Sequence, residues 1–299
     1  MTAVPVASAN DIEICHEIDG PDDGEPLVLI NGLGSQLVRW EPEWIELLVT
    51  RGFRVITLDN RDVGHSSWFD HVDLDPMAEF AKVFEGGEPS SAYTLSDMAA
   101  DTVALLDHLE VGRAHVVGVS MGGMIAQTAA IEHPDRVASL TSVMSNTGEP
   151  GVGAPTPAAS EVLTAPAPTD RDGYIDHCTE GNRVYGSEAF WDEEAVRGLH
   201  AREYDRGFHP AGTGRHLLAV LASGDRVEGL RSLRVPTAVV HGAVDPLVQI
   251  DGGRRTAELV PDAEFVEIAD MAHDLPPEVW DQVADAIDAA ADRAATANF

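Results

Sequence analysis

The stretch HVVGVSMGG, residues 115–123, decides the class of fold that this sequence adopts. Its first five residues are almost entirely apolar, which is typical of a parallel strand that is buried on both faces. A helical pattern starts at Ser120 and runs to about His133, where Pro134 ends it. Small residues around the serine allow the strained backbone of a sharp turn between strand and helix. The stretch therefore predicts that the hydroxyl group of Ser120 stands above the sheet at the N-terminus of a helix.

The same unit, a short apolar run followed by a loop and a helical segment, recurs along the chain. Runs such as PLVLI and PTAVVH are apolar almost throughout rather than alternating, which favours a parallel sheet with helices on both faces. One helix is predicted to begin with Ser96 or Asp97 as its cap and to end at Gly112. The predicted strands are Ile12–Ile18, Leu27–Asn31, Arg54–Leu58, His115–Val119, Val137–Met144, Thr237–His241 and Glu264–Ile268.

One segment interrupts this pattern. Residues 148–168 are rich in Pro, Gly, Ala and Thr, which indicates a loop that leaves the core. Helical pieces that carry several aromatic residues follow, and the strand pattern then resumes. We therefore predict an α/β core formed by residues 1–147 and 232–299, with residues 148–231 inserted as a helical cap.

A serine hydroxyl is a poor nucleophile at neutral pH and needs a base within hydrogen-bonding reach, which a third group must orient. Two later strands end in loops that supply these groups, because VPTAVVHGAVDPLV contains Asp245 and AEFVEIADMAHDLP contains His273. Loops after parallel strands lie at the edge of the sheet where Ser120 also lies. We predict that Ser120 is the nucleophile, His273 the base and Asp245 the acid that orients the base. Asp251 and Asp270 are the alternatives for the acid.

Acyl transfer by such a triad also needs two backbone donors that converge on the carbonyl oxygen of the substrate. The first predicted donor is the N–H group of Met121, which follows the nucleophile. The second is expected in the loop Asn31-Gly32-Leu33-Gly34, directly after the apolar run LVLI, and we assign it to Leu33. Together these groups predict an oxyanion hole beside Ser120.

Five motifs resemble those of a known family. GVSMGG, HGAVDP, MAHDLP, NGLGSQ and LDNRDVGHSS are similar to motifs of the α/β-hydrolase superfamily, and in particular of carboxylesterases of the aclacinomycin methylesterase type. The resemblance covers most of the chain apart from the cap and assigns the triad to the same three residues. It implies an α/β-hydrolase fold with a mostly parallel, eight-stranded sheet, of which one strand is unassigned here. It also implies that Asp59 and Arg61 hold loops at the edge of the sheet, with direct substrate contact as the alternative.

The triad predicts two-step cleavage of carboxylic esters of small to medium apolar molecules through an acyl-enzyme intermediate. Predicted substrate contacts are Trp68, Tyr185, Phe190 and Trp191, and packing within the cap is the alternative for the last three. The same triad also serves lactonases, cofactor-free perhydrolases of the haloperoxidase type and carbon–carbon bond hydrolases. A non-enzymatic ligand receptor is a further alternative, which the complete triad argues against. The sequence has no HExxH, CxxC or Walker motif, so we predict no metal and no cofactor.

The composition favours an acidic, cytoplasmic protein. No stretch approaches the roughly 18 apolar residues that cross a bilayer, and the segment MTAVPVASANDIEI lacks the basic and apolar regions of a signal peptide. Nineteen Lys and Arg against 51 Asp and Glu give a formal net charge of −32, which would repel nucleic acid and anionic membranes. We therefore expect a small-molecule ester as the partner, with no nucleic acid and no membrane, and a monomer or homodimer.

Adaptation to high salt is one explanation of this charge, because dense carboxylates keep a protein hydrated while counterions screen their repulsion. A GC-rich genome explains the single lysine, Lys82, but not the excess of carboxylates. If the protein is adapted to salt, its melting temperature should rise substantially between about 0.1 M and 2 M NaCl, beyond the range of Debye screening. An esterase of ordinary net charge serves as the control in the same thermal melts. An equal gain in both proteins would contradict the explanation.

Overall fold

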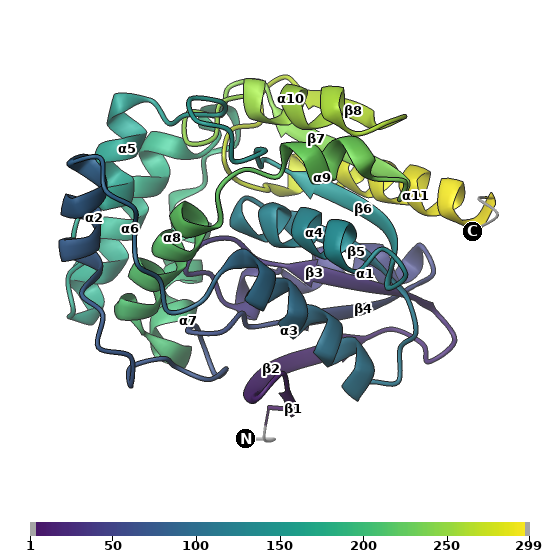
Figure 1. Ribbon diagram of the computed structural model, residues 1–299, viewed down its shortest axis with the longest axis horizontal. Helices are drawn as coiled ribbons and strands as arrows, with labels where there is room; N and C mark the ends of the chain where they lie inside the picture. The colour runs from purple at the N-terminus through teal and green to yellow at the C-terminus, as the bar shows by residue number, and fades with distance from the viewer. Residues whose placement is uncertain (1–3, 297–299) are drawn as a thin grey trace.

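In a computed structural model, which describes residues 4–296, one eight-stranded sheet forms the centre of the molecule with helices on both faces (Figure 1). The order across the sheet is β1-β2-β4-β3-β5-β6-β7-β8. Strand β2 runs antiparallel to β1 and β4, and the remaining pairs are parallel, which confirms the predicted fold. The strands are β1 (Val6–Ala9), β2 (Ile12–Asp19), β3 (Glu25–Ile30), β4 (Phe53–Leu58), β5 (Ala114–Val119), β6 (Val137–Val143), β7 (Thr237–Gly242) and β8 (Glu264–Ile268).

Strand β1 is the eighth strand, which the sequence pattern did not identify. It forms a hairpin with β2 in which Ala9 pairs with Ile12. The two residues between them, Asn10 and Asp11, have φ angles of 51° and 61°. Positive φ at both central residues is the geometry of a type I′ turn, and Asn and Asp tolerate it better than other residues with a side chain. A strand of four residues is too short for its alternation to stand out from the neighbouring loop.

The two faces of the sheet bury different side chains of the same strands, because successive residues of a strand point to opposite sides. In β3, Val28 and Ile30 belong to the same buried cluster as residues of α3, α4, α9 and α10, whereas Leu27 and Leu29 belong to the cluster that includes residues of α1 and α11. Within residues 4–296 no helix combines the length and the apolar character needed to span a bilayer. The helices of the two faces are α1 (Pro42–Thr50), α3 (Leu95–His108), α4 (Met121–Glu132), α9 (Val227–Ser232), α10 (Asp251–Leu259) and α11 (Trp280–Thr296).

Helix α3 differs from the prediction at both ends. Thr94 is the N-cap instead of Ser96 or Asp97, and it exchanges hydrogen bonds with the backbone and side chain of Asp97 in a capping box. The helix ends at His108, and the chain then takes a positive φ of 55° at Glu110, before the predicted glycine. The reciprocal capping bonds favour the earlier start, because two N–H groups of the first turn gain partners at once.

A second group of helices lies together to one side of the sheet, on the left in Figure 1. Helix α2 belongs to this group although it precedes the predicted cap in sequence, and it packs against α8. Helix α9, at the end of the predicted cap, packs against α4 and α10. The division of the chain at residues 148 and 231 stays a prediction. The helices of this group are α2 (Pro76–Phe84), α5 (Pro157–Thr164), α6 (Arg171–Tyr185), α7 (Glu193–Gly207) and α8 (Pro210–Ser223), and short 3₁₀ turns are η1 (Leu37–Arg39), η2 (Glu188–Phe190) and η3 (Pro277–Val279).

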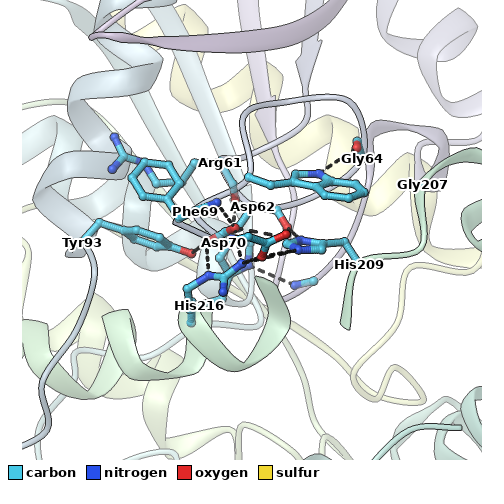
Figure 2. A network of polar contacts seen from close by, with 12 residues as sticks. Arg61, Asp62, Gly64, Phe69, Asp70, Tyr93, Gly207, His209 and His216 are labelled. Atoms are coloured by element: carbon cyan, nitrogen blue, oxygen red, sulfur yellow. Dashed lines mark hydrogen bonds and ion pairs between the residues drawn. The ribbon is translucent and has the colours of Figure 1, made fainter. Parts of the chain in front are cut away.

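A buried ionic network connects α8 to the loop after β4 (Figure 2). Arg215 donates to both carboxylate oxygens of Asp62 at 2.8 Å, and also to Oδ1 of Asp70 at 2.7 Å. The hydroxyl group of Tyr93 donates to the second oxygen of Asp62 at 2.6 Å, and His209 lies 2.9 Å from Asp70. Although burial opposes ionisation, the hydrogen bonds from Arg215 hold the pKa of Asp62 below its usual value. The network therefore holds α8 to the loop after β4 through paired charges.

Removal of Arg215 should destabilise the protein strongly. Arg215→Met leaves the carboxylate of Asp62 buried without its counter-charge, and we expect the free energy of unfolding to fall by about 3–5 kcal/mol in urea titrations at pH 7. Arg231→Met is the matched control, because Arg231 forms an exposed pair with Glu228 at 2.8 Å, and its loss should cost less than about 1 kcal/mol. Similar losses for the two variants would show that the buried network does not fasten the cap.

Candidate active site

Ser120 lies between β5 and α4 with φ 54° and ψ −120°, a backbone conformation that residues with side chains rarely adopt. The turn is possible because glycines stand two residues before and two residues after the serine. A Cβ atom on Gly118 would lie 2.0 Å from the carbonyl oxygen of Gly122, and one on Gly122 would lie 2.1 Å from that of Ile30. The N–H group of Ser120 donates to the carbonyl group of Val143 in the adjacent strand at 2.9 Å. These contacts hold the serine at the edge of the sheet, as the sequence predicts.

The structure places the three predicted triad residues in consecutive hydrogen-bonding contact. Nε2 of His273 lies 2.9 Å from Oγ of Ser120, and its Nδ1 lies 2.7 Å from Oδ2 of Asp245. Asp245 follows β7 and His273 follows β8, so the two side chains reach Ser120 from loops at the same edge of the sheet. Residues that are 153 and 28 positions apart in the chain are thereby in hydrogen-bonding contact.

The environment of Asp245 favours an oriented carboxylate. Its side chain has no exposed surface, and Oδ1 accepts hydrogen bonds from the N–H groups of Leu247 at 2.8 Å and Val248 at 2.9 Å. The other oxygen, Oδ2, therefore remains for His273. The alternatives Asp251 and Asp270 are exposed on the surface.

A second histidine lies behind the acid. Nε2 of His241 lies 2.7 Å from the carbonyl oxygen of Val248 and 3.6 Å from Oδ2 of Asp245. Burial lowers the pKa of His241, so the ring is neutral at pH 7 and donates its Nε2–H to the carbonyl group. Its contacts place His241 as a support for the loop that carries Asp245, which agrees with its position within a strand.

The turn after α6 holds the loop of the base. The carbonyl group of Tyr185 accepts a hydrogen bond from the N–H group of His273 at 2.8 Å. The hydroxyl group of Ser187 accepts a hydrogen bond from the N–H group of Ala272, also at 2.8 Å. The carboxyl group of Asp274 in turn accepts hydrogen bonds from the N–H and hydroxyl groups of Ser187. Asp274 is therefore a partly buried acceptor that fixes this turn. Burial raises the pKa of this carboxyl group.

The predicted oxyanion loop lies directly over the nucleophile. A Cβ atom on Gly32 would lie 3.3 Å from the Cβ atom of Ser120, which shows how closely the loop approaches. Within residues 4–296, the N–H groups of Leu33 and Met121 have no hydrogen-bond acceptor. Two free donors beside a serine hydroxyl are what an oxyanion hole requires. Their role stays a proposal.

The four predicted substrate contacts have different surroundings. Trp68 stacks on His209 with 3.9 Å between ring centroids and remains 42% exposed. Trp191 lies beneath the guanidinium group of Arg183, and Phe190 packs against the core cluster on the α11 side of the sheet. Tyr185 is linked to the site through its carbonyl group, and burial raises the pKa of its phenol to about 12. Contact of these side chains with substrate stays a prediction.

Asp59 and Arg61 have the structural roles that the resemblance implied. Oδ1 of Asp59 accepts a hydrogen bond from the N–H group of Leu37 at 2.7 Å, and Oδ2 pairs with Arg206 of α7 at 2.7 Å. Arg61 forms two hydrogen bonds of 2.7 Å with the buried carboxylate of Asp101. Asp59 therefore holds the loop after β4 to the start of η1 and to α7, and Arg61 holds it to α3.

Among the residues that the structure describes, one cluster has the spacing of metal ligands, formed by Asp62, Asp70 and His209. Arg215 already donates to both carboxylates in this cluster. A cation would have to compete with this guanidinium group for the same oxygens, so the donor set does not fit a metal site.

Comparison with known proteins identifies the family. The profile of the α/β hydrolase fold matches residues 25–278, and the chain therefore belongs to the α/β-hydrolase family. It is 30% identical to rhodomycin D methylesterase of Streptomyces peucetius over 96% of this chain and 97% of that protein. A putative non-heme bromoperoxidase of Mycobacterium tuberculosis is 24% identical over 88% and 91% of the two chains. The crystal structure of the enol-lactonase from Burkholderia xenovorans LB400 is similar in fold, with a TM-score of 0.71 and 23% identity over 96% and 99%.

The assignment of the acid can be tested by three parallel substitutions. Asp245→Asn should lower kcat for ester hydrolysis by about 10³- to 10⁴-fold with a much smaller effect on KM, because it disturbs the tautomer and charge stabilisation of the base. Asp251→Asn and Asp270→Asn should change kcat by less than about tenfold, since both side chains are exposed. All three changes remove one negative charge, so steady-state kinetics compare them directly. A larger loss for either control would show that Asp245 is not the acid.

Proposed function

We propose that the protein is a serine carboxylesterase that cleaves esters of small to medium apolar molecules. The observation that carries the proposal is the line from Ser120 through His273 to Asp245, with contacts of 2.9 Å and 2.7 Å. The free N–H groups of Leu33 and Met121 beside it supply the second requirement of acyl transfer. The relationship to a methylesterase over nearly the whole chain supports ester chemistry.

The hydrogen bonds around His273 determine the direction of proton transfer in this proposal. The ionised carboxylate of Asp245 can only accept, so Nδ1 of His273 carries a hydrogen and Nε2 presents a lone pair to the hydroxyl group of Ser120. His273 can therefore take the proton while Oγ of Ser120 attacks the carbonyl carbon of the ester. Asp245 stabilises the imidazolium that forms, because it lies buried at 2.7 Å.

The two steps of the reaction use the same groups. Negative charge develops on the carbonyl oxygen during the attack, and the N–H groups of Leu33 and Met121 stabilise it. The imidazolium of His273 then gives its proton to the leaving alcohol, which leaves an ester between the acid and Ser120. A water molecule, activated by His273 in the same way, releases the acid and restores the hydroxyl group.

Lactone hydrolysis is the second candidate, because a lactone is a cyclic ester that the same steps would open. The similarity in fold to an enol-lactonase, at a TM-score of 0.71, supports this candidate. The relationship to a putative bromoperoxidase supports perhydrolysis as a further candidate. Carbon–carbon bond hydrolysis by the same triad is a further alternative. Side chains around the site therefore decide among reactions that share one nucleophile.

Replacement of the nucleophile gives the first test. Ser120→Ala should lower ester turnover by several orders of magnitude without changing thermal stability, because the covalent route is lost while the small side chain still fits the turn. In the wild-type protein an alkyl phosphonate should label Ser120 alone, as identified by peptide mass spectrometry. Labelling of another serine, or a variant that keeps more than about a few per cent of activity, would contradict the assignment.

A substrate panel separates the candidate reactions with the same pair of proteins. It consists of p-nitrophenyl esters of graded chain length, a simple lactone, and bromide with hydrogen peroxide. We expect the ester rates to exceed the others and to depend on Ser120. A lactone rate that exceeds every ester rate would favour the second candidate, and turnover that survives Ser120→Ala would contradict both.

A further inference from the structure

The cap contacts the oxyanion loop through the side chain of His216 on α8. The ring is completely buried. Its Nε2 lies 2.7 Å from the carbonyl oxygen of Arg61, and its Nδ1 lies 3.2 Å from the backbone nitrogen of Gly34. Arg61 and His216 are seen at the edge of the network in Figure 2, beside Asp62. One imidazole thus connects the loop after β4 with the loop after β3.

The two partners define the tautomer of His216. A carbonyl oxygen can only accept, so Nε2 must carry the hydrogen that is donated to Arg61. Nδ1 then carries no hydrogen, and its lone pair accepts the hydrogen bond from the N–H group of Gly34. Burial lowers the pKa of His216 to about 4, so the ring is neutral at pH 7 and keeps this acceptor.

The hydrogen bond to His216 fixes one of the two peptide groups that flank the α-carbon of Leu33. The first peptide group, which contains the N–H group of Leu33, is fixed because the carbonyl group of Gly32 accepts a hydrogen bond from Ser35 at 3.2 Å. The second is fixed by the bond from Gly34 to His216 at 3.2 Å. Since both peptide planes are held, rotation about the bonds to the α-carbon of Leu33 is restricted. The direction of the Leu33 N–H group is restricted with it.

Helix α8 also packs directly on this loop. Gly34 has a φ of 65°, and a Cβ atom there would lie 2.4 Å from Oγ1 of Thr213, one turn before His216. The helix itself is anchored by Arg215, whose hydrogen bonds of 2.8 Å to Asp62 hold it to the loop after β4. The acceptor for Gly34 is therefore presented from a rigid support rather than from a mobile side chain.

We propose that His216 is a positioning residue, which accepts the hydrogen bond of Gly34 and so directs the N–H group of Leu33 toward the substrate oxygen above Ser120. The inference rests on the proposed function, because it assigns the Leu33 N–H group to the oxyanion hole. His216 touches no reacting atom in this scheme. It acts through the loop, and the cap thereby contributes to the rate of the reaction as well as to enclosing the site.

Two substitutions at this position separate the two hydrogen bonds. The oxygen of an asparagine can replace Nδ1 as the acceptor for Gly34, whereas the longer glutamine can replace Nε2 as the donor to Arg61. His216→Gln should therefore lower kcat by about 10- to 100-fold with KM changed less than about threefold, and His216→Asn should keep kcat within about fivefold of wild type. The affinity for an alkyl boronic acid, whose tetrahedral adduct places an oxygen at the donors, should fall in parallel with kcat.

His209→Gln is the matched control. Like His216, His209 contacts the segment after β4, through Asp62 and Asp70, but it does not contact Gly34 in the loop after β3. Its kcat should stay within about threefold of wild type. Equal losses of kcat in both variants at position 216, or a similar loss in the control, would overturn the inference, because the cap would then act only as a structural support. An unchanged kcat in His216→Gln would also overturn it. If the wild-type protein cleaves no ester and Ser120 is not labelled, the proposed function itself fails.

Discussion

The close crossing of β5 and α4 is the constraint on which the rest of the site depends. Ser120 can take a positive φ only where the backbone of α4 approaches β3 and β5 without intervening Cβ atoms, and the glycines at 118 and 122 provide that space. Once the serine is held at this edge, the parallel strands β7 and β8 deliver the acid and the base to the same edge. A larger side chain at either glycine would move the helix, and the distances within the triad would change with it.

Three ion pairs join α7 and α8 to the rest of the fold. Arg39 pairs with Glu203 at 2.8 Å, Arg206 with Asp59 at 2.7 Å, and Arg215 with Asp62 at 2.8 Å, and in each pair the carboxylate is buried. Buried pairs of this kind specify one arrangement, because breaking them leaves a charge without compensation. Of the three arginines, Arg215 is buried and the other two are partly exposed.

The sequence predicted the parts of the molecule that local patterns encode. The apolar runs predicted seven strands, and the loops after the last two strands correctly indicated that Asp245 and His273 lie beside Ser120. Patterns that span fewer residues were harder to interpret, as the four-residue strand β1 and the N-cap Thr94 show. A short segment carries too little periodicity to distinguish one assignment from another.

Contacts between distant segments were beyond the reach of these patterns. Ser187 meets Asp274 across 87 positions of the chain, and Gly34 meets His216 across 182. Nothing in the residues around either partner indicates the other, because a hydrogen bond to a backbone group imposes no spacing or composition. Such contacts depend on where the cap settles on the core, and that position results from the packing and ion pairs of many residues together.

The contacts of α6 and α8 with the loops that carry His273 and Gly34 have a consequence for how this protein can diverge. A chimaera with the corresponding helices of another hydrolase would lose the carbonyl group of Tyr185 and the imidazole of His216, which bind these loops. Grafts would have to retain the turn at 185–187 and the central part of α8. Selection for a different substrate would therefore act on the cap surfaces between these anchors.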